Sequence, residues 1–262
     1  MDFKLKEKVA IIGGSSKGLG KACAISLAKE GVNIVLCAND TESLQKTKTE
    51  IEAFGVRVLA LNVDMSAETD NEQIIEQSIK MFGRIDILIN NSGGPKPGKF
   101  IDLTLQDFDN AYNSVFKYNI RMIKACLPFM EKNNWGRIIN ITSLSVKEPS
   151  PSLLLSNVFR AATVSLAKSI SKDLIGKGIT INNICPGAFK TDRAIELLQQ
   201  KANNMGISFD EAEQLAVNNF PQKRYQKPEE LGDLVCFLAS EKASSLTGTT
   251  IQIDGGISNS LL

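Results

Sequence analysis

The chain alternates short apolar runs with longer amphipathic segments, and this alternation constrains its fold more than any other feature. The runs are rich in Val and Ile, as strands are, and the segments between them have helical periodicity. Such alternation predicts a doubly wound α/β fold, in which helices cover both faces of a seven-stranded parallel sheet and ligands bind where the strands end. We expect strands at 8–14, 33–38, 56–63, 86–91, 137–142, 178–185 and 250–256, and helices at 18–30, 41–53, 67–82, 107–130, 153–175, 191–203, 208–218 and 228–239.

The sequence contains no histidine, and this excludes several kinds of active site. A Ser-His-Asp triad, a Cys-His pair, an HExxH zinc site and a histidine general acid all need that residue. The five cysteines lie far apart, with no CxxC pair, so we expect buried free thiols in a reducing cytoplasm and no metal site. These cysteines are Cys23, Cys37, Cys126, Cys185 and Cys236.

Net charge and hydropathy indicate a globular protein without a polyanionic partner. A net charge of +1 gives no general attraction to nucleic acid or anionic lipid. No apolar stretch approaches the roughly 18 residues that a membrane helix needs. With no linker in the sequence, we expect one domain over 1–262, in which the polar segment 190–224 is either a substrate-covering insertion or a plain pair of surface helices.

A glycine-rich turn, GGSSKGLG, follows the first expected strand and opens the first helix at 13–20. Glycines at such a turn let the backbone approach a pyrophosphate closely, and the amides at the helix start attract the anion. A tight strand-to-helix turn without a ligand is the alternative interpretation.

Further motifs follow in order: NVDM at 62–65, NNSG at 90–93, CPG at 185–187 before Thr191, and TGTTIQIDGG at 247–256. Together with the GxxxGxG spacing, they make the chain similar over essentially its whole length to the short-chain dehydrogenase/reductase family, which has a Rossmann-type fold. The resemblance implies adenine contacts from Asp64 and Met65, and nicotinamide contacts near Thr191. The cofactor-binding residues that it implies are Gly14, Ser16, Lys17, Gly18, Leu19, Gly20, Asn39, Asp64, Met65, Asn91, Ser92, Gly93, Arg160, Pro186, Gly187 and Thr191.

Charge near the adenosine ribose indicates which dinucleotide binds. Lys17 lies in the glycine turn, where NADP-preferring relatives often carry a basic residue. The second strand ends in Ala38 and Asn39, so the family's NAD-selecting acid is absent there. Asp40 lies about 20 residues beyond the last glycine and supports NAD by distance alone. We predict NADP(H), with NAD as the alternative.

The expected catalytic residues depart from the family pattern. The strand at 137–142 leads to Ser143, which matches the family's substrate-orienting serine. Thirteen residues further on, Ser156 and Arg160 stand where the resemblance implies the Tyr and Lys of YxxxK. Val115 stands where it implies the Asn of the proton relay. We therefore predict Ser143, Ser156 and Arg160 as the catalytic residues, in a site that lacks the usual proton path.

The replacements support different chemistry from the residues that they replace. A serine hydroxyl is a poor acid unless a partner activates it, and a guanidinium stays protonated. Arg160 can stabilise a developing oxyanion, so water would supply the proton. Tyr112 and Tyr118 would be substitute acids only if they faced the crevice, and we expect them to pack instead. Lys147 and Lys190 are placed either to meet an anionic substrate or to remain solvated.

From these features we predict an NADP(H)-dependent oxidoreductase that acts on a small-molecule carbonyl or alcohol and looks most like 3-oxoacyl thioester reductases. The alternative is a nucleotide-binding protein that has lost this catalysis and serves a regulatory or assembly role. The resemblance also implies a homotetramer, formed through the long helices at 107–130 and 153–175 and the C-terminal strand region.

Overall fold

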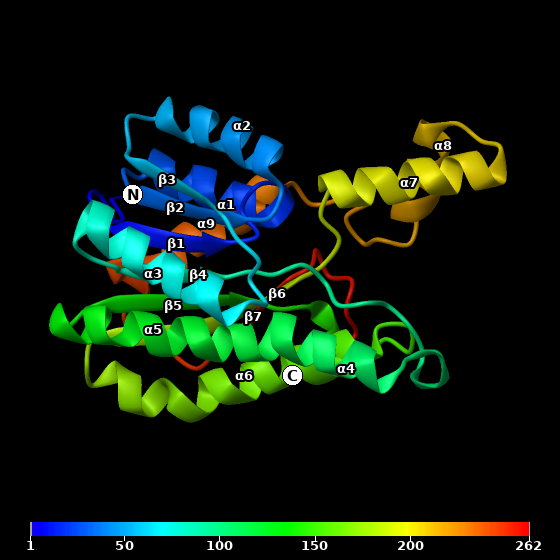
Figure 1. Cartoon of the computed structure of the whole chain (residues 1–262). Helices are drawn as coiled ribbons and strands as arrows, with labels where there is room; N and C mark the ends of the chain where they lie inside the picture. Colours follow the sequence, from blue (N-terminus) through cyan, green and yellow to red (C-terminus); the bar gives the residue numbers. More distant parts are fainter. Residues whose placement is uncertain (1, 262) are drawn as a thin grey trace.

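The computed structural model describes residues 2–261 and contains one parallel sheet in the order β3-β2-β1-β4-β5-β6-β7. The order reverses between β1 and β4, where a doubly wound sheet opens a crevice at its carboxyl edge. This confirms the predicted fold class (Figure 1). The strands are β1 (Val9–Gly13), β2 (Asn33–Ala38), β3 (Val58–Asn62), β4 (Ile87–Asn90), β5 (Gly136–Ile141), β6 (Ile179–Pro186) and β7 (Thr250–Ile253).

Two apolar clusters cover the two faces of the sheet. Alternate residues of β1 point to opposite sides, so Ala10 and Ile12 join one cluster and Val9 and Ile11 the other. Helices α1 (Gly18–Lys29), α2 (Thr41–Glu52) and α9 (Pro228–Ala239) pack on the first face. Helices α3 (Glu68–Phe82), α5 (Tyr118–Lys132) and α6 (Leu154–Ile175) pack on the second. All five cysteines are buried as free thiols, as predicted.

The long helix expected at 107–130 is interrupted. Helix α4 (Leu105–Ala111) begins at a capping box in which Thr104 and Asp107 exchange hydrogen bonds. A π-helical turn, η2 (Tyr112–Lys117), then joins it to α5. No Gly or Pro occurs in this turn, so the apolar periodicity gave no sign of it. The turn holds Val115, which is buried.

The segment 190–224 forms an arm of two helices, α7 (Asp192–Met205) and α8 (Phe209–Val217), that projects from the body (Figure 1). Leu198 and Ala202 of α7 are buried, as are Ala212 and Val217 of α8. The helix pair therefore has a small core of its own. None of the helices within residues 2–261 is both long and apolar enough to cross a membrane.

A ladder of amides crosses the sheet just below its carboxyl edge. Asn90, Asn140, Asn183 and Thr250 are in register on four neighbouring strands. The Asn90 amide donates to Asn140 at 2.9 Å, and the Asn140 amide donates to Asn183 at 2.9 Å. Because the buried amide nitrogens of Asn90 and Asn140 both donate to the next strand, they fix the strands from which the next loops leave.

Candidate functional site

The glycine turn after β1 is packed so tightly that side chains cannot enter it. A Cβ atom at Gly20 would lie 2.3 Å from the Gly14 carbonyl oxygen, and one at Gly13 would lie 2.4 Å from the Asn91 carbonyl oxygen. Gly14 and Gly18 have φ near +55°, which favours glycine. Helix α1 starts here with no acidic residue in its first turn. The turn therefore presents helix-start amides to an anion, as a pyrophosphate site requires.

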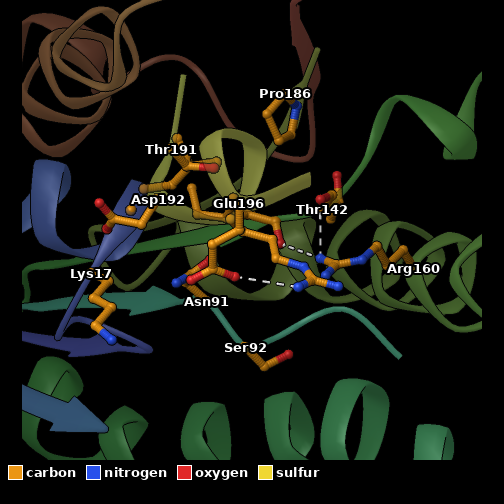
Figure 2. Close-up of a pocket in the computed structure, with 13 residues that line it drawn as sticks. Lys17, Asn91, Ser92, Thr142, Arg160, Pro186, Thr191, Asp192 and Glu196 are labelled. Carbon is orange, nitrogen blue, oxygen red and sulfur yellow. Dashed lines mark hydrogen bonds and ion pairs between the residues drawn. The ribbon is translucent and has the colours of Figure 1, made fainter. Parts of the chain in front are cut away.

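Two clefts open along the carboxyl edge of the sheet, on either side of Asn91 and Ser92, which line both. One, of about 390 Å³, extends toward β2 and β3, and the other, of about 360 Å³, extends toward β5 and β6. The Asn91 amide donates to the carbonyls of Gly13 and Gly14, which joins β4 to the glycine turn. Of the predicted residues, the first cleft contains Gly14, Ser16, Asn39, Asp64, Met65 and Gly93, and the second contains Lys17, Gly18, Leu19, Arg160, Pro186 and Thr191 (Figure 2).

Lys17 and Asp40 form an ion pair, with 2.7 Å between Nζ and Oδ2. The Lys17 ammonium keeps the pKa of the Asp40 carboxyl well below its usual range, and the carboxylate raises the pKa of Lys17. Asp40 also caps α2 by accepting from the Ser43 amide. Asp40, whose distance from the glycines supports NAD, is thus paired with Lys17, whose charge supports NADP.

Arg160 brings a buried guanidinium to the second cleft, near the end of β5. Its side chain is 8% exposed, and Nη1 donates to the carbonyls of Ile141 at 2.7 Å and Thr142 at 3.0 Å. Burial lowers the pKa of Arg160 to about 10, so the group remains a cation at neutral pH. Figure 2 shows its guanidinium directed at the strand ends, across the cleft from Asn91 and Ser92.

A third cleft, of about 480 Å³, contains Ser143 and Ser145 and shares Pro186 with the second. The Ser143 hydroxyl accepts from the Ser145 amide, so its own proton is free to be donated. Ser156 is buried behind this surface, with its hydroxyl 3.2 Å from that of Ser145. The structure therefore places Ser156 one hydroxyl away from the cleft. Sequence reasoning missed Ser145, although its position two residues after Ser143 was a signal. Gly187 also lines this third cleft. Gly20 lines none of the three clefts and packs against the Gly14 carbonyl within the glycine turn.

Other candidate groups are engaged elsewhere. Lys190 forms an ion pair with Glu213 at 2.6 Å, its side chain is 43% exposed, and it lines none of the three clefts, which fits the alternative of a solvated lysine. Tyr118 is wholly buried, as expected, and no partner for its hydroxyl is found within residues 2–261. Burial raises the pKa of Tyr118 well above its ordinary value, so it is no substitute acid. Tyr112 is partly exposed and lines none of the three clefts.

Comparison with known proteins agrees with this geometry. A family model described as "Enoyl-(Acyl carrier protein) reductase" matches residues 14–258. The chain belongs to the short-chain dehydrogenase/reductase family. It is 32% identical to the NADPH-dependent reductase BacG of Bacillus subtilis, over 98% of this chain and 100% of that protein. It is 28% identical to the 3-oxoacyl-[acyl-carrier-protein] reductase FabG of Staphylococcus epidermidis, over 95% of this chain and 98% of that protein.

The solved structures of this family include one with nearly the same backbone. L-sorbose reductase from Gluconobacter frateurii, crystallised with NADPH and L-sorbose, superposes with a TM-score of 0.96 at 30% identity, and the match covers all of both chains. The tight glycine turn and the two clefts, which meet at Asn91 and Ser92 after β4, fit an extended dinucleotide.

Proposed function

We propose that this member of the family is an NADPH-dependent reductase of small carbonyl compounds. The pyrophosphate would lie on the glycine turn, and the adenosine in the cleft of Asp64 and Met65. The 2′-phosphate would meet Lys17, and Thr191 with the turn at 186–187 would hold the nicotinamide amide. The two NADPH-dependent relatives, BacG and L-sorbose reductase, support this assignment. When bound, the cofactor supplies a hydride.

Arg160 and Ser143 would hold the carbonyl oxygen of the substrate. The guanidinium offers a fixed positive charge, and the serine hydroxyl offers a proton for a hydrogen bond, because its oxygen is already an acceptor. Ser156 and Arg160 would stand in place of the Tyr and Lys of the family's YxxxK, with Ser156 acting through Ser145. A single well-placed donor of this kind contributes roughly 2.7–4 kcal/mol to the stability of an oxyanion. Water would supply the proton.

The observation that carries this proposal is the buried guanidinium of Arg160 at the edge of the cofactor cleft. The same site favours a second candidate, a nucleotide-binding protein without catalysis, because the Ser156 hydroxyl that would replace the acid is buried behind Ser145. An enzyme should oxidise NADPH with some carbonyl compound, whereas a binding protein should bind NADPH and leave it unchanged.

The test is NADPH oxidation against a panel of ketones, aldehydes and 3-oxoacyl thioesters, run beside the triple variant Val115→Asn, Ser156→Tyr, Arg160→Lys. Turnover by the natural protein supports the reductase. Turnover by the variant alone supports the binding protein, because the pocket is then competent and only the native residues fail. Tight NADPH binding without turnover in either protein also contradicts the reductase.

We also propose a single domain in which the arm of α7 and α8 covers the substrate. Its support is that α7 begins at the second cleft, where Asp192, Arg193 and Glu196 join the lining. A homotetramer is supported by apolar side chains left exposed on α6, where Val158 is 44% exposed. The buried free thiols support a cytoplasmic location.

A further inference from the structure

The third cleft has a single charged side chain in its lining. Among the described residues that line it, only Glu148 carries a charge, and the others are apolar, small or hydroxyl-bearing. Within residues 2–261, no lysine or arginine nitrogen lies within 4.0 Å of the Glu148 carboxylate. The neighbouring Lys147 lines none of the three clefts. The third cleft, which adjoins the second at Pro186, therefore presents a negative charge that no cation of the described chain pairs with.

Two bonds from the C-terminal segment hold the Glu148 carboxylate in place. Its Oε2 atom accepts from the Ser258 hydroxyl at 2.8 Å and from the Asn259 amide at 3.0 Å. These bonds lower the pKa of Glu148, so the group is a carboxylate at neutral pH. Both bonds go to Oε2, and Oε1 accepts no hydrogen bond within the described part of the chain. One carboxylate oxygen is thus left for a ligand.

Glu148 and Ser143 lie at the two ends of one short turn. The Ser143 side chain caps a 3₁₀ turn (Leu144–Val146) by accepting from the Ser145 amide. The Glu148 amide donates to the Leu144 carbonyl at 3.1 Å, which fixes the far end of the turn. A hydroxyl donor and a carboxylate acceptor are therefore held at a fixed separation along the same cleft.

The remaining walls suit an organic cation. Phe220 lines the cleft, and its ring packs perpendicular to that of Tyr225, with 5.3 Å between the ring centroids. Aromatic rings attract cations electrostatically, and quaternary ammonium groups are commonly recognised in this way. Leu144, Leu153 and Ile257 add apolar surface for the carbon atoms around such a nitrogen.

A polyol is the other kind of ligand that a carboxylate binds, because hydroxyl groups donate to it. Such a ligand needs several polar groups on the cleft walls, since each buried hydroxyl requires a partner. Two of the serines at this cleft already have hydroxyl partners, Ser145 with Ser156 and Ser150 with Ser152, each at 3.2 Å. The walls therefore favour an alkylated ammonium group over a polyol.

We propose that the third cleft recognises the ammonium group of an amino ketone or amino aldehyde, and that Glu148 determines this specificity. The inference rests on the proposed NADPH-dependent reductase. The carbonyl group lies toward Ser143, and the ammonium nitrogen lies at the Glu148 carboxylate and the Phe220 ring. The carbonyl carbon accepts a hydride, the C=O π electrons move onto the oxygen, and that oxygen takes a proton from water. NADPH becomes NADP⁺, and the ammonium group keeps all its bonds.

Two pairs of ketones that differ only in charge test the inference. Trimethylammonioacetone is matched by methyl neopentyl ketone, and para-trimethylammonioacetophenone by para-tert-butylacetophenone, because a positive nitrogen replaces a quaternary carbon in each pair. The value of kcat/KM with NADPH is measured for all four ketones in the natural protein and in Glu148→Gln. A positive nitrogen also activates the carbonyl, so the informative quantity is the change in the charged-to-neutral ratio on mutation.

We expect Glu148→Gln to lower this ratio roughly two- to fivefold in at least one pair, because solvent screens an exposed ion pair. The change should lie mainly in KM, since the ammonium group is remote from the reacting carbon. Glutamine keeps an oxygen for the bonds from Ser258 and Asn259, and general damage would lower both members of a pair equally. The control Glu76→Gln removes an exposed carboxylate from α3, which lines none of the three clefts, and should not change the ratio.

An unchanged ratio in both pairs would overturn the inference and leave the proposed reductase intact. No oxidation of NADPH with these ketones or with the carbonyl panel would overturn the reductase, and a binding measurement then tests the cleft separately. Phenyltrimethylammonium, which has no carbonyl group, is titrated into the protein in the presence of NADP⁺ by calorimetry. We expect binding that weakens roughly two- to fivefold in Glu148→Gln and is unchanged in Glu76→Gln. Absent binding, or equal binding by Glu148→Gln, would overturn the inference whether or not ketones are reduced.

Discussion

The two halves of the crevice differ in how their charged side chains are paired. The nucleotide half lies around β1, β2 and β4, and the reaction half lies around β5, β6 and α6. In the nucleotide half, Lys17 is paired with Asp40 and the anion-binding groups are backbone amides held by glycines. In the reaction half, Arg160 is buried, and no carboxylate of residues 2–261 lies within 4.0 Å of its guanidinium. Anion binding in the nucleotide half thus depends on the backbone conformation, whereas the reaction half has one positive charge that a ligand would balance.

Removing that charge should have the largest effect. Arg160→Gln retains hydrogen-bonding groups but loses the cation, so we expect kcat for the reduction to fall roughly 10²–10³-fold. NADPH affinity, measured by fluorescence titration, should change much less, since the glycine turn is untouched. Equal losses in kcat and in NADPH affinity would instead make Arg160 mainly a cofactor-binding residue and weaken the contrast between the two halves.

The next effect tests the backbone shape of the nucleotide half. In Gly20→Ala the new methyl group would lie 2.3 Å from the Gly14 carbonyl oxygen. Such overpacking costs about 1–3 kcal/mol, so we expect NADPH affinity to fall roughly 10–100-fold by titration calorimetry.

The matched control is Gly176→Ala at the end of α6. A Cβ atom there meets nothing within 4 Å, and the residue has φ of −64°, so NADPH affinity should not change. A loss of affinity in the control, or none in Gly20→Ala, would mean that the packing of the turn does not set cofactor binding.

The two halves also differ in how well the sequence predicted them. The positions of the strands and of the glycine turn followed from local patterns, because apolar periodicity and the conformational demands of glycine act over a few residues. Ser143, Ser156 and Arg160 could be proposed as catalytic candidates from the resemblance to the family and its spacing. Their environments could not be read from spacing, because burial and pairing depend on residues far apart in the chain.

Three particular features show this limit. Ser156 lies behind Ser145 because η3 (Leu144–Val146) turns the chain after β5. The pairing of Lys190 with Glu213 depends on how α8 folds back near the start of α7. The π-turn η2 has no Gly or Pro to mark it. Each is a tertiary contact or a backbone irregularity without a local sequence signal.

Cofactor choice should respond more weakly to mutation. Lys17→Ala removes the cation expected at the 2′-phosphate, so the preference for NADPH over NADH should fall roughly two- to fivefold, because exposed charges are screened by solvent. Asp40→Asn frees Lys17 from its partner and should move the preference in the opposite direction. The ratio of kcat/KM for the two cofactors measures both. Identical ratios in both variants and the natural protein would show that this pair does not select the cofactor.

The smallest effect is a predicted absence of change. Because the chain has no histidine, the residue that ordinarily titrates near neutrality is missing from the reaction half, so kcat should stay flat over roughly pH 6–9. Arg160, with its pKa lowered to about 10, keeps its charge through that range and loses it as pH rises further, so kcat should fall above it. Initial rates in buffers of constant ionic strength measure this profile. A bell-shaped profile centred near neutrality would require a group in the reaction half that titrates there. The unpaired charge of Arg160 would then no longer be what distinguishes the reaction half from the nucleotide half.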